Sequence, residues 1–273
     1  MSLTDWIGKT ETRSDSVIAG PVAALSATLD REDPLPQPGD PLPLLWHWLF
    51  FLDRHRGSEL GPDGHARRGG LLPPVPLPRR MWAGSRFEFR HPLRIGDQTT
   101  RETRVIDIKE KSGRSGPLVF VVVRHEISNA HGLAVSEEHD IVYRDQGPGA
   151  PVQPAPVDAA WERRIQADDV LLFRYSALTF NAHRIHFDRR YATEVEGYPG
   201  LVVHGPLIAT LLMDLLRRNQ PAANVVRFSF RAVSPLFDTA PFVVCGKPAG
   251  KIVHLWAKDA AGNLAMSAEA LVR

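Results

Sequence analysis

The sequence predicts an α+β fold in which one arrangement of a helix and an antiparallel sheet occurs twice. Two short motifs recur in the same order. "RFEFR" at 86–90 returns as "RFSFR" at 227–231, and "LAVS" at 133–136 returns as "LAMS" at 264–267. Matched motifs in the same order indicate an internal duplication. In each half, an apolar stretch of helical length precedes several segments of alternating polarity, which is typical of the α+β class.

A segment with few bulky apolar residues separates the two halves. Residues 146–157 read QGPGAPVQPAPV, and such a Pro-, Gly- and Ala-rich composition is typical of linkers. We therefore expect a first unit at 1–145 and a second unit at 158–273.

The elements of the second unit follow from periodicity. Residues 206–219 (PLIATLLMDLLRRN) carry leucines at helical spacing, with Pro206 at the start and two arginines in the last turn. In the first unit, the apolar run 42–55 (LPLLWHWLFFLDRH) is expected to be the matching helix, with each sheet wrapped around its helix. The expected strands are 85–93, 100–111, 117–127 and 135–144 in the first unit, and 225–233, 241–247, 251–259 and 264–272 in the second.

The composition narrows the class of protein. Thirty-three basic residues nearly balance 31 acidic ones, without the clustered basic stretch of a nucleic-acid-binding protein, so we expect no nucleic-acid partner. No run of about 18 apolar residues is present, and the N-terminus does not resemble a secretory signal, so we expect a cytoplasmic protein without a membrane span. Cys245, in the apolar run PFVVCG, is expected to be a buried strand residue.

The stretch "RYSALTFNAHRIHFDRRY", residues 174–191, concentrates polar side chains next to the predicted helix of the second unit. Three interpretations compete. His183, His186 and Asp188, joined by His204, could bind a metal, or the stretch could be a polar turn. The third interpretation is acid–base catalysis by a histidine, with the free N–H of Gly205 at the helix start stabilising a developing oxyanion.

The third interpretation is favoured by a resemblance to a known family. "SALTFNAHRIHFD…GLVVHGPLIATLL" resembles the MaoC-like hydratases and dehydratases, which have the hotdog fold. Within them the sequence is most similar to mitochondrial-type 3-hydroxyacyl-thioester dehydratases and to itaconyl-CoA and mesaconyl-C4-CoA hydratases. "LLPPVPLPRRMWAGSRFEF" in the first unit also resembles this subfamily, which has two hotdogs in one chain. The resemblance implies a double hotdog, in which only the second unit carries the hydratase motif and the first shapes the substrate pocket.

The resemblance assigns the catalytic roles. Asn181 stands at the family's aspartate position, His186 at its histidine position and Gly205 at its oxyanion position. The asparagine is a departure, because an amide cannot accept a proton. We therefore expect Asn181 to hold the water and His186 to move the proton.

Further residues are expected to bind the substrate. A CoA thioester carries phosphates, and a dicarboxylic acyl group adds a carboxylate, so arginines are expected nearby. Arg184 lies within the motif, and Trp82 would pack on the acyl chain or pantetheine unless it belongs to the core. The full set of expected substrate-binding residues is Tyr175, Ser176, Thr179, Arg184, Arg79, Arg80 and Trp82.

The sequence thus predicts an acyl-CoA hydratase for a C5-dicarboxylic enoyl-CoA, such as itaconyl-CoA or mesaconyl-C4-CoA, with citramalyl-CoA as the product. The chemistry requires no metal and no cofactor apart from the CoA of the substrate, and we expect a homo-oligomer. The alternatives are a 3-hydroxyacyl-thioester dehydratase of fatty-acyl metabolism, a thioesterase and a non-catalytic acyl-CoA-binding protein. For the thioesterase, the only acid of the second helix is Asp214.

Overall fold

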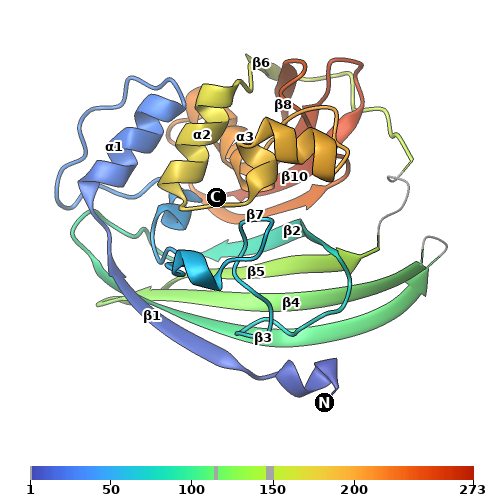
Figure 1. Ribbon diagram of the computed structural model, residues 1–273. Coiled ribbons are helices and arrows are strands. Elements are labelled where there is room, and N and C mark those ends of the chain that lie inside the picture. Colours follow the sequence, from blue (N-terminus) through green and yellow to red (C-terminus); the bar gives the residue numbers. More distant parts are fainter. Residues whose placement is uncertain (1, 114–115, 146–150) are drawn as a thin grey trace.

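The computed structural model describes residues 2–113, 116–145 and 151–273. Its strands form one ten-stranded sheet in the order β1-β3-β4-β5-β2-β7-β10-β9-β8-β6, and every pairing is antiparallel (Figure 1). The strands are β1 (Thr10–Ser16), β2 (Arg79–Phe89), β3 (Gln98–Gly113), β4 (Gly116–Asn129), β5 (Gly132–Arg144), β6 (Trp161–Ile165), β7 (Val225–Ala232), β8 (Phe242–Ala249), β9 (Ile252–Lys258) and β10 (Leu264–Val272).

The two halves of the sheet meet where the repeated motif pairs with itself. β2 of the first half is hydrogen-bonded to β7 of the second, and Phe87 lies directly opposite Phe228. Their ring centroids are 5.9 Å apart, and both side chains are buried. All eight strands predicted from alternation are present, because their inward side chains fill the core while their outward ones are polar or charged.

The core of the second half is built on α3 (Gly205–Asn219), around which the strands curve (Figure 1). Pro206 stands in its first turn. Arg217 and Arg218 stand in its last turn, where their positive charges interact favourably with the negative end of the helix dipole. Every residue from Leu207 to Leu216 is buried, as expected for a helix enclosed by a sheet.

The prediction of a helix at 42–55 in the first half was wrong. Only a single 3-10 turn forms there, η2 (Trp46–Leu49). Leu45 and Phe51, on either side of it, have φ values of 69° and 57°, which end helical geometry. The apolar run is instead an irregular core segment, and His47 within it is buried beside Glu137.

The sequence did not predict two further helices, which lie on the same side of the sheet as α3. α1 (Ala19–Thr28) and α2 (Asp169–Leu178) are neighbours on the side of the sheet that α3 occupies (Figure 1). The side chain of Asp168 caps α2 by accepting a hydrogen bond from the N–H of Leu171 at 2.8 Å. No helix in the described part of the chain is long and apolar enough to cross a membrane.

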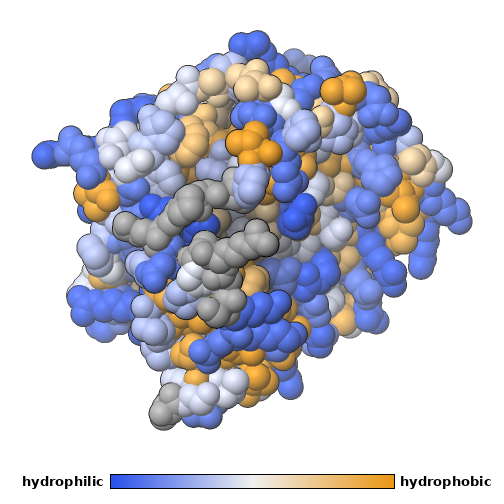
Figure 2. Space-filling model, turned by 90° about the vertical axis from the view of Figure 1, so that its right-hand side faces the viewer, coloured by the Kyte–Doolittle hydropathy of each residue, from blue (hydrophilic) through white to orange (hydrophobic). Residues whose placement is uncertain are grey.

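The proposed linker falls partly on residues 146–150, which lie outside the described residues. The following segment runs along the second half, where Pro154 forms a bridge with Asn263. Ala155 packs against Cys245 and Trp256, so Cys245 is the buried strand residue that the sequence predicts. Burial raises the pKa of its thiol to about 12, which leaves the thiol unreactive. On the face shown in Figure 2, hydrophilic side chains predominate and apolar ones are scattered.

Candidate active site

The site is built around the loop between α2 and α3, residues 179–204, which we call the histidine loop. It contains one short 3-10 turn, η4 (Arg184–His186), and a π-helical turn, η5 (Tyr191–Val195). Because α2 and α3 are both packed in the core, they fix the two ends of this loop.

His186 is buried and its ring has a defined tautomer. Nδ1 lies 2.7 Å from the carbonyl oxygen of Val202, which can only accept, so Nδ1 carries the proton and donates it. Nε2 has no hydrogen-bond partner among the described residues and carries a lone pair. Burial lowers the pKa of this imidazole to about 4, and the bond to Val202 opposes the shift only in part. His186 is therefore a neutral base at neutral pH.

The ring of His204 stacks on one face of the ring of His186. The two rings stack with centroids 3.7 Å apart, and His204 is completely buried. Its Nε2 lies 2.8 Å from the Oγ of Ser176, while its buried Nδ1 has no partner in the described structure. Burial lowers the pKa of His204 well below the ordinary value, so this ring is also neutral.

Gly205 begins α3 immediately after His204. Its N–H finds no hydrogen-bond partner within the described residues, as expected at the first turn of a helix. A Cβ built on Gly205 would meet nothing within 4 Å, so the space beside this backbone is open. The site therefore combines a neutral base with a free backbone donor at the positive end of a helix.

Asn181 lies at the start of the histidine loop. Its Oδ1 accepts the N–H of His183 at 3.0 Å, which forms a tight turn. The amide nitrogen Nδ2 has no partner among the described side chains. Asn181 can therefore donate a hydrogen bond from Nδ2, and it cannot act as a base.

The residues at α2 that were expected to bind substrate form hydrogen bonds with other protein groups. Tyr175 is fully buried and hydrogen-bonds to Thr210, and burial raises the pKa of its hydroxyl. Ser176 bonds to His204, and the hydroxyl of Thr179 donates to the carbonyl of Tyr175 within the same helix. These contacts favour a supporting role for all three.

Arg184 is fully engaged by protein groups. Its guanidinium pairs with Asp188 at 2.7 Å, lies over the ring of Tyr191 and donates to the carbonyl of Pro62 in the first half. Asp188 is thus the structural partner of an arginine. These contacts favour a role for Arg184 in holding the histidine loop against the first half rather than in binding a carboxylate.

Two functional candidates that the sequence analysis missed come from the first half. Asp63 and His65 lie beside His183, and one ligand-type atom from each of the three lies within 4.8 Å of the others. Asp63 accepts a hydrogen bond from His65 Nδ1 at 2.9 Å, and the rings of His65 and His183 are 4.0 Å apart. The "DGH" sequence, an acid and a histidine around a turn glycine, was the available signal.

The first-half residues of "RRMW" differ in their surroundings. Trp82 packs edge-on against Trp48 and close to His139, and its N–H donates to Gly84 and Ser85, so it belongs to the core. Arg79 lies over Tyr198, and its Nε is buried without a partner in the described residues. Arg80 contacts the hydroxyl of Tyr143 and has no carboxylate partner in the described part of the chain.

Arg80 also acts electrostatically on two histidines of the site. Its positive charge contributes to lowering the pKa of both His65 and His183, after burial, so it faces the same space.

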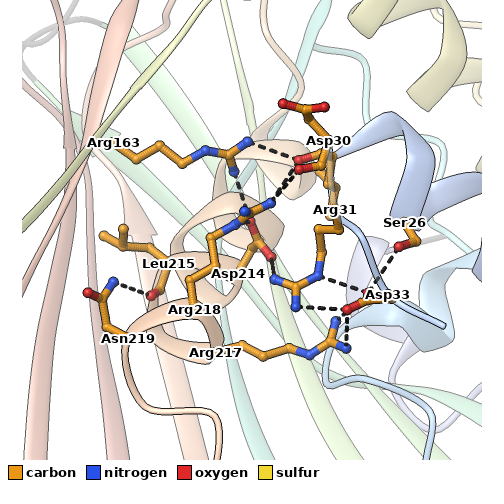
Figure 3. A network of polar contacts seen from close by, with 11 residues as sticks. Ser26, Asp30, Arg31, Asp33, Arg163, Asp214, Leu215, Arg217, Arg218 and Asn219 are labelled. Carbon is orange, nitrogen blue, oxygen red and sulfur yellow. Dashed lines mark hydrogen bonds and ion pairs between the residues drawn. The ribbon is translucent and has the colours of Figure 1, made fainter.

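Asp214 in the middle of α3 is occupied by arginines. Its carboxylate accepts hydrogen bonds from Arg31, Arg163 and Arg218, and its side chain is 1% exposed (Figure 3). A carboxylate enclosed in this way holds the halves together and is not free for catalysis.

Comparison with known proteins identifies the family. The model of the family "Hydroxyacyl-thioester dehydratase type 2" matches residues 45–238. The chain belongs to this family. It is 51% identical over 269 residues to a mesaconyl-C(4)-CoA hydratase of Chloroflexus aurantiacus, covering 96% of this chain and 95% of the relative. It is 28% identical to the mitochondrial hydroxyacyl-thioester dehydratase type 2 of Schizosaccharomyces pombe, over 88% of this chain and 86% of the relative.

Solved structures agree with the fold. A MaoC-like dehydratase superposes with a TM-score of 0.74 at 16% identity, covering all of this chain and 99% of that one. A Mycobacterium tuberculosis protein described as a double hotdog superposes with a TM-score of 0.62 at 12% identity, covering 98% of this chain and 96% of that one. The predicted double hotdog, and the prediction of an enzyme of the hydratase and dehydratase type, are confirmed.

Proposed function

We propose that this protein adds water reversibly to the double bond of a C5-dicarboxylic enoyl-CoA, with mesaconyl-C4-CoA or itaconyl-CoA as the substrate and citramalyl-CoA as the product. The chemistry is supported by two groups of one site, the neutral His186 and the N–H of Gly205 at the start of α3. Neither Nε2 of His186 nor this N–H has a hydrogen-bond partner in the described part of the chain. The close relative that hydrates mesaconyl-C4-CoA supports the acyl group.

The reaction follows from these positions. Water loses a proton to Nε2 of His186 as its oxygen bonds to the β-carbon. In mesaconyl-C4-CoA the double bond is conjugated with the thioester, so its electrons move onto the thioester oxygen, which accepts the N–H of Gly205. The enolate then takes a proton at the α-carbon, and the thioester is restored. Asn181 would donate from Nδ2 to hold the water. The reaction consists of the addition of water to the β-carbon and of proton transfers, so no metal or cofactor is needed.

Arg80 and Arg79 are the groups that we assign to the free carboxylate. Neither has a carboxylate partner among the described residues, and Arg80 acts electrostatically on the histidines of the site. A guanidinium can bind a carboxylate through two parallel hydrogen bonds. The proposal also includes a homo-oligomer and a cytoplasmic location, which light scattering and cell fractionation would test.

The first test is turnover on itaconyl-CoA, mesaconyl-C4-CoA and crotonyl-CoA, followed by mass spectrometry for the gain of water. His186→Ala should lower kcat by about 10²–10⁴-fold, and His131→Ala, at an exposed turn, is the matched control. A loss below tenfold in His186→Ala would contradict the assignment of the base.

The same assay separates the acyl groups. Arg80→Met should raise KM for the dicarboxylic thioesters while changing crotonyl-CoA turnover little, and Arg104→Met, an exposed arginine paired with Glu102, is its control. Turnover of crotonyl-CoA alone would favour the second candidate, a dehydratase of unbranched acyl chains, which the family model and the S. pombe relative support. Release of free thiol would indicate a thioesterase, and binding without turnover an acyl-CoA-binding protein.

A further inference from the structure

Three polar side chains, His183, His65 and Asp63, form a row that begins beside His186 and ends at the carboxylate of Asp63. His183 lies next to His186, with ring centroids 5.4 Å apart, and His65 lies 4.0 Å from His183. At the far end, Asp63 accepts hydrogen bonds from both the ring and the backbone N–H of His65. The row therefore crosses from the second half of the chain into the first.

The chemistry needs a negative charge near His186, and the acids of the histidine loop are occupied by other groups. Asp188 pairs with Arg184, Glu194 pairs with Arg190, and Glu196 accepts a hydrogen bond from Tyr191. When His186 accepts a proton it becomes a cation in a buried site, which burial disfavours. Its Nδ1 bonds to a neutral carbonyl, and the amide of Asn181 carries no charge. A histidine hydrogen-bonded to a carboxylate holds a proton far better, because the carboxylate orients the ring and balances the imidazolium.

We propose that His183 and His65 form a proton relay from His186 to the charge of Asp63, and that Asp63 replaces the carboxylate absent at position 181. This inference rests on the proposed hydratase function. Asp63 is a positioning residue, because it acts through His65.

The relay is balanced in protons and electrons. His186 takes one proton from water as the C–O bond forms and the double-bond electrons move to the thioester oxygen. The proton passes through His183 to Nε2 of His65, where the imidazolium faces the ionised Asp63. It returns by the same path to the α-carbon, which re-forms the thioester carbonyl and leaves all the histidines neutral.

The electrostatics of the row suit this role. Burial raises the pKa of Asp63, but the hydrogen bonds from His65 outweigh burial and hold the carboxyl ionised. Burial lowers the pKa of His65, and it lowers that of His183 to about 2, so both rings rest in the neutral form. Two neutral imidazoles next to an ionised carboxylate can receive a proton and release it again.

The first-half loop is held close to the histidine loop by specific contacts. The backbone N–H of Arg184 donates to the carbonyl of Asp63 at 2.9 Å, and its side chain donates to Pro62. Gly64 approaches so closely that a Cβ there would lie 1.8 Å from the carbonyl oxygen of Ala182. These backbone contacts thus fix the position of Asp63 and His65, which we call the dyad, relative to the histidine loop.

The kinetic test uses Asp63→Asn and His65→Gln with the thioester that the wild type turns over best. Both should lower kcat by about 10²-fold or more with KM changed less than threefold, because the relay acts after binding. His55→Gln, which removes the pairing of His55 with Glu59 on the same segment, should leave kcat within twofold. A wild-type kcat in either Asp63→Asn or His65→Gln, or an effect on KM alone, would overturn the relay.

A second measurement does not depend on turnover or on a folded variant. Ring ¹H–¹⁵N spectra of the ¹⁵N-histidine-labelled wild type should show a downfield Nδ1–H resonance from a ring bonded to a carboxylate, and its absence would overturn the Asp63–His65 pair. In folded Asp63→Asn this resonance should vanish. If no thioester is turned over while the resonance is present, the function has failed and the dyad has not.

Metal analysis completes the test, because two imidazoles and a carboxylate could also bind Zn²⁺. The purified protein should contain no stoichiometric metal and keep its activity after treatment with a chelator. One equivalent of metal that is lost in Asp63→Asn would overturn the relay in favour of a metal site.

Discussion

The rings of His186 and His204 lie almost parallel, with 3.7 Å between their centroids and 19° between their planes. Within the described residues each ring has one nitrogen without a hydrogen-bond partner, Nε2 in His186 and Nδ1 in His204, and the nitrogen of His204 is buried. His204 is completely buried and bonded to Ser176. Stacking on His204 therefore fixes the plane of the His186 ring, and Ser176 of α2 holds His204 in place.

Ser176→Ala tests this support. It removes the partner of His204 Nε2, and a buried ring nitrogen without a partner costs about 1–3 kcal/mol of unfolding free energy. Because His204 then loses its orientation, kcat should also fall, by up to about 10²-fold. Ser234→Ala, which removes a hydrogen bond to Leu264 far along the chain, should lower stability alone. Equal kcat values in both variants would show that the stack does not position the base.

The pH dependence of activity should report the low pKa of His186. Its value of about 4 in the folded protein predicts that kcat/KM stays level from pH 7 to about pH 5 and falls only as pH approaches 4. Burial of the ring sets this value, and the hydrogen bond to Val202 opposes it only in part. Stopped-flow jumps from neutral pH would measure the profile, and an acidic limb near pH 6.5 would contradict this environment for the base.

Stability should fall over the same range. Unfolded histidine takes up a proton near pH 6.5, whereas folded His186 does not until about pH 4. The stabilisation is complete above pH 6.5 and is lost as pH falls toward 4, by roughly 3 kcal/mol for this residue. Urea unfolding at pH 7 and pH 5 would measure the loss, and His186→Ala should show a shallower dependence.

Gly64 and Gly69 provide a matched pair for the contact between the two halves. Both have a positive φ, of 89° and 101°, so alanine is strained at either position. Only at Gly64 would the new Cβ also meet backbone, at Ala182, while at Gly69 nothing lies within 4 Å. Gly64→Ala should therefore displace the dyad and lower kcat by about 10²-fold, and Gly69→Ala should keep kcat within threefold. A steady-state comparison at equal folded fraction decides between these outcomes.

The parts of the fold that depend on local periodicity could be predicted from the sequence. Alternating side chains defined the strands, and the leucines of 206–219 defined α3. The run 42–55 failed because an unbroken apolar stretch carries no period. Its one polar core residue, His47, is satisfied by Glu137, far along the chain. No local pattern contains that pairing.

The candidate site divides in the same way. His186, Asn181 and Gly205 could be found because they occur in one short motif, and their predicted roles remain predictions. Asp63 and His65 could not, because they reach His183 only when the two halves pack together. Arg184 pairs with Asp188, which stands one helical turn further on, and the expected contact of Arg184 with the substrate stays a prediction.

Asp214 should be essential for stability and dispensable for chemistry. It joins Arg31 of the first half to Arg163 of β6 and Arg218 of α3, in a network that also contains Asp33 (Figure 3). Asp214→Asn leaves three arginines facing a neutral amide, which should cost about 3–5 kcal/mol of unfolding free energy. Urea denaturation would measure this, with Glu88→Gln, which breaks an exposed pair with Arg227, expected to cost less than about 1 kcal/mol.

The same variant tests the thioesterase alternative. If Asp214 only holds the halves together, kcat per folded molecule should stay within tenfold of the wild type, since the carboxylate contacts arginines and no open space. A loss of activity without a loss of stability would reverse this assignment, because it would require the carboxylate to leave its arginines and act on the thioester.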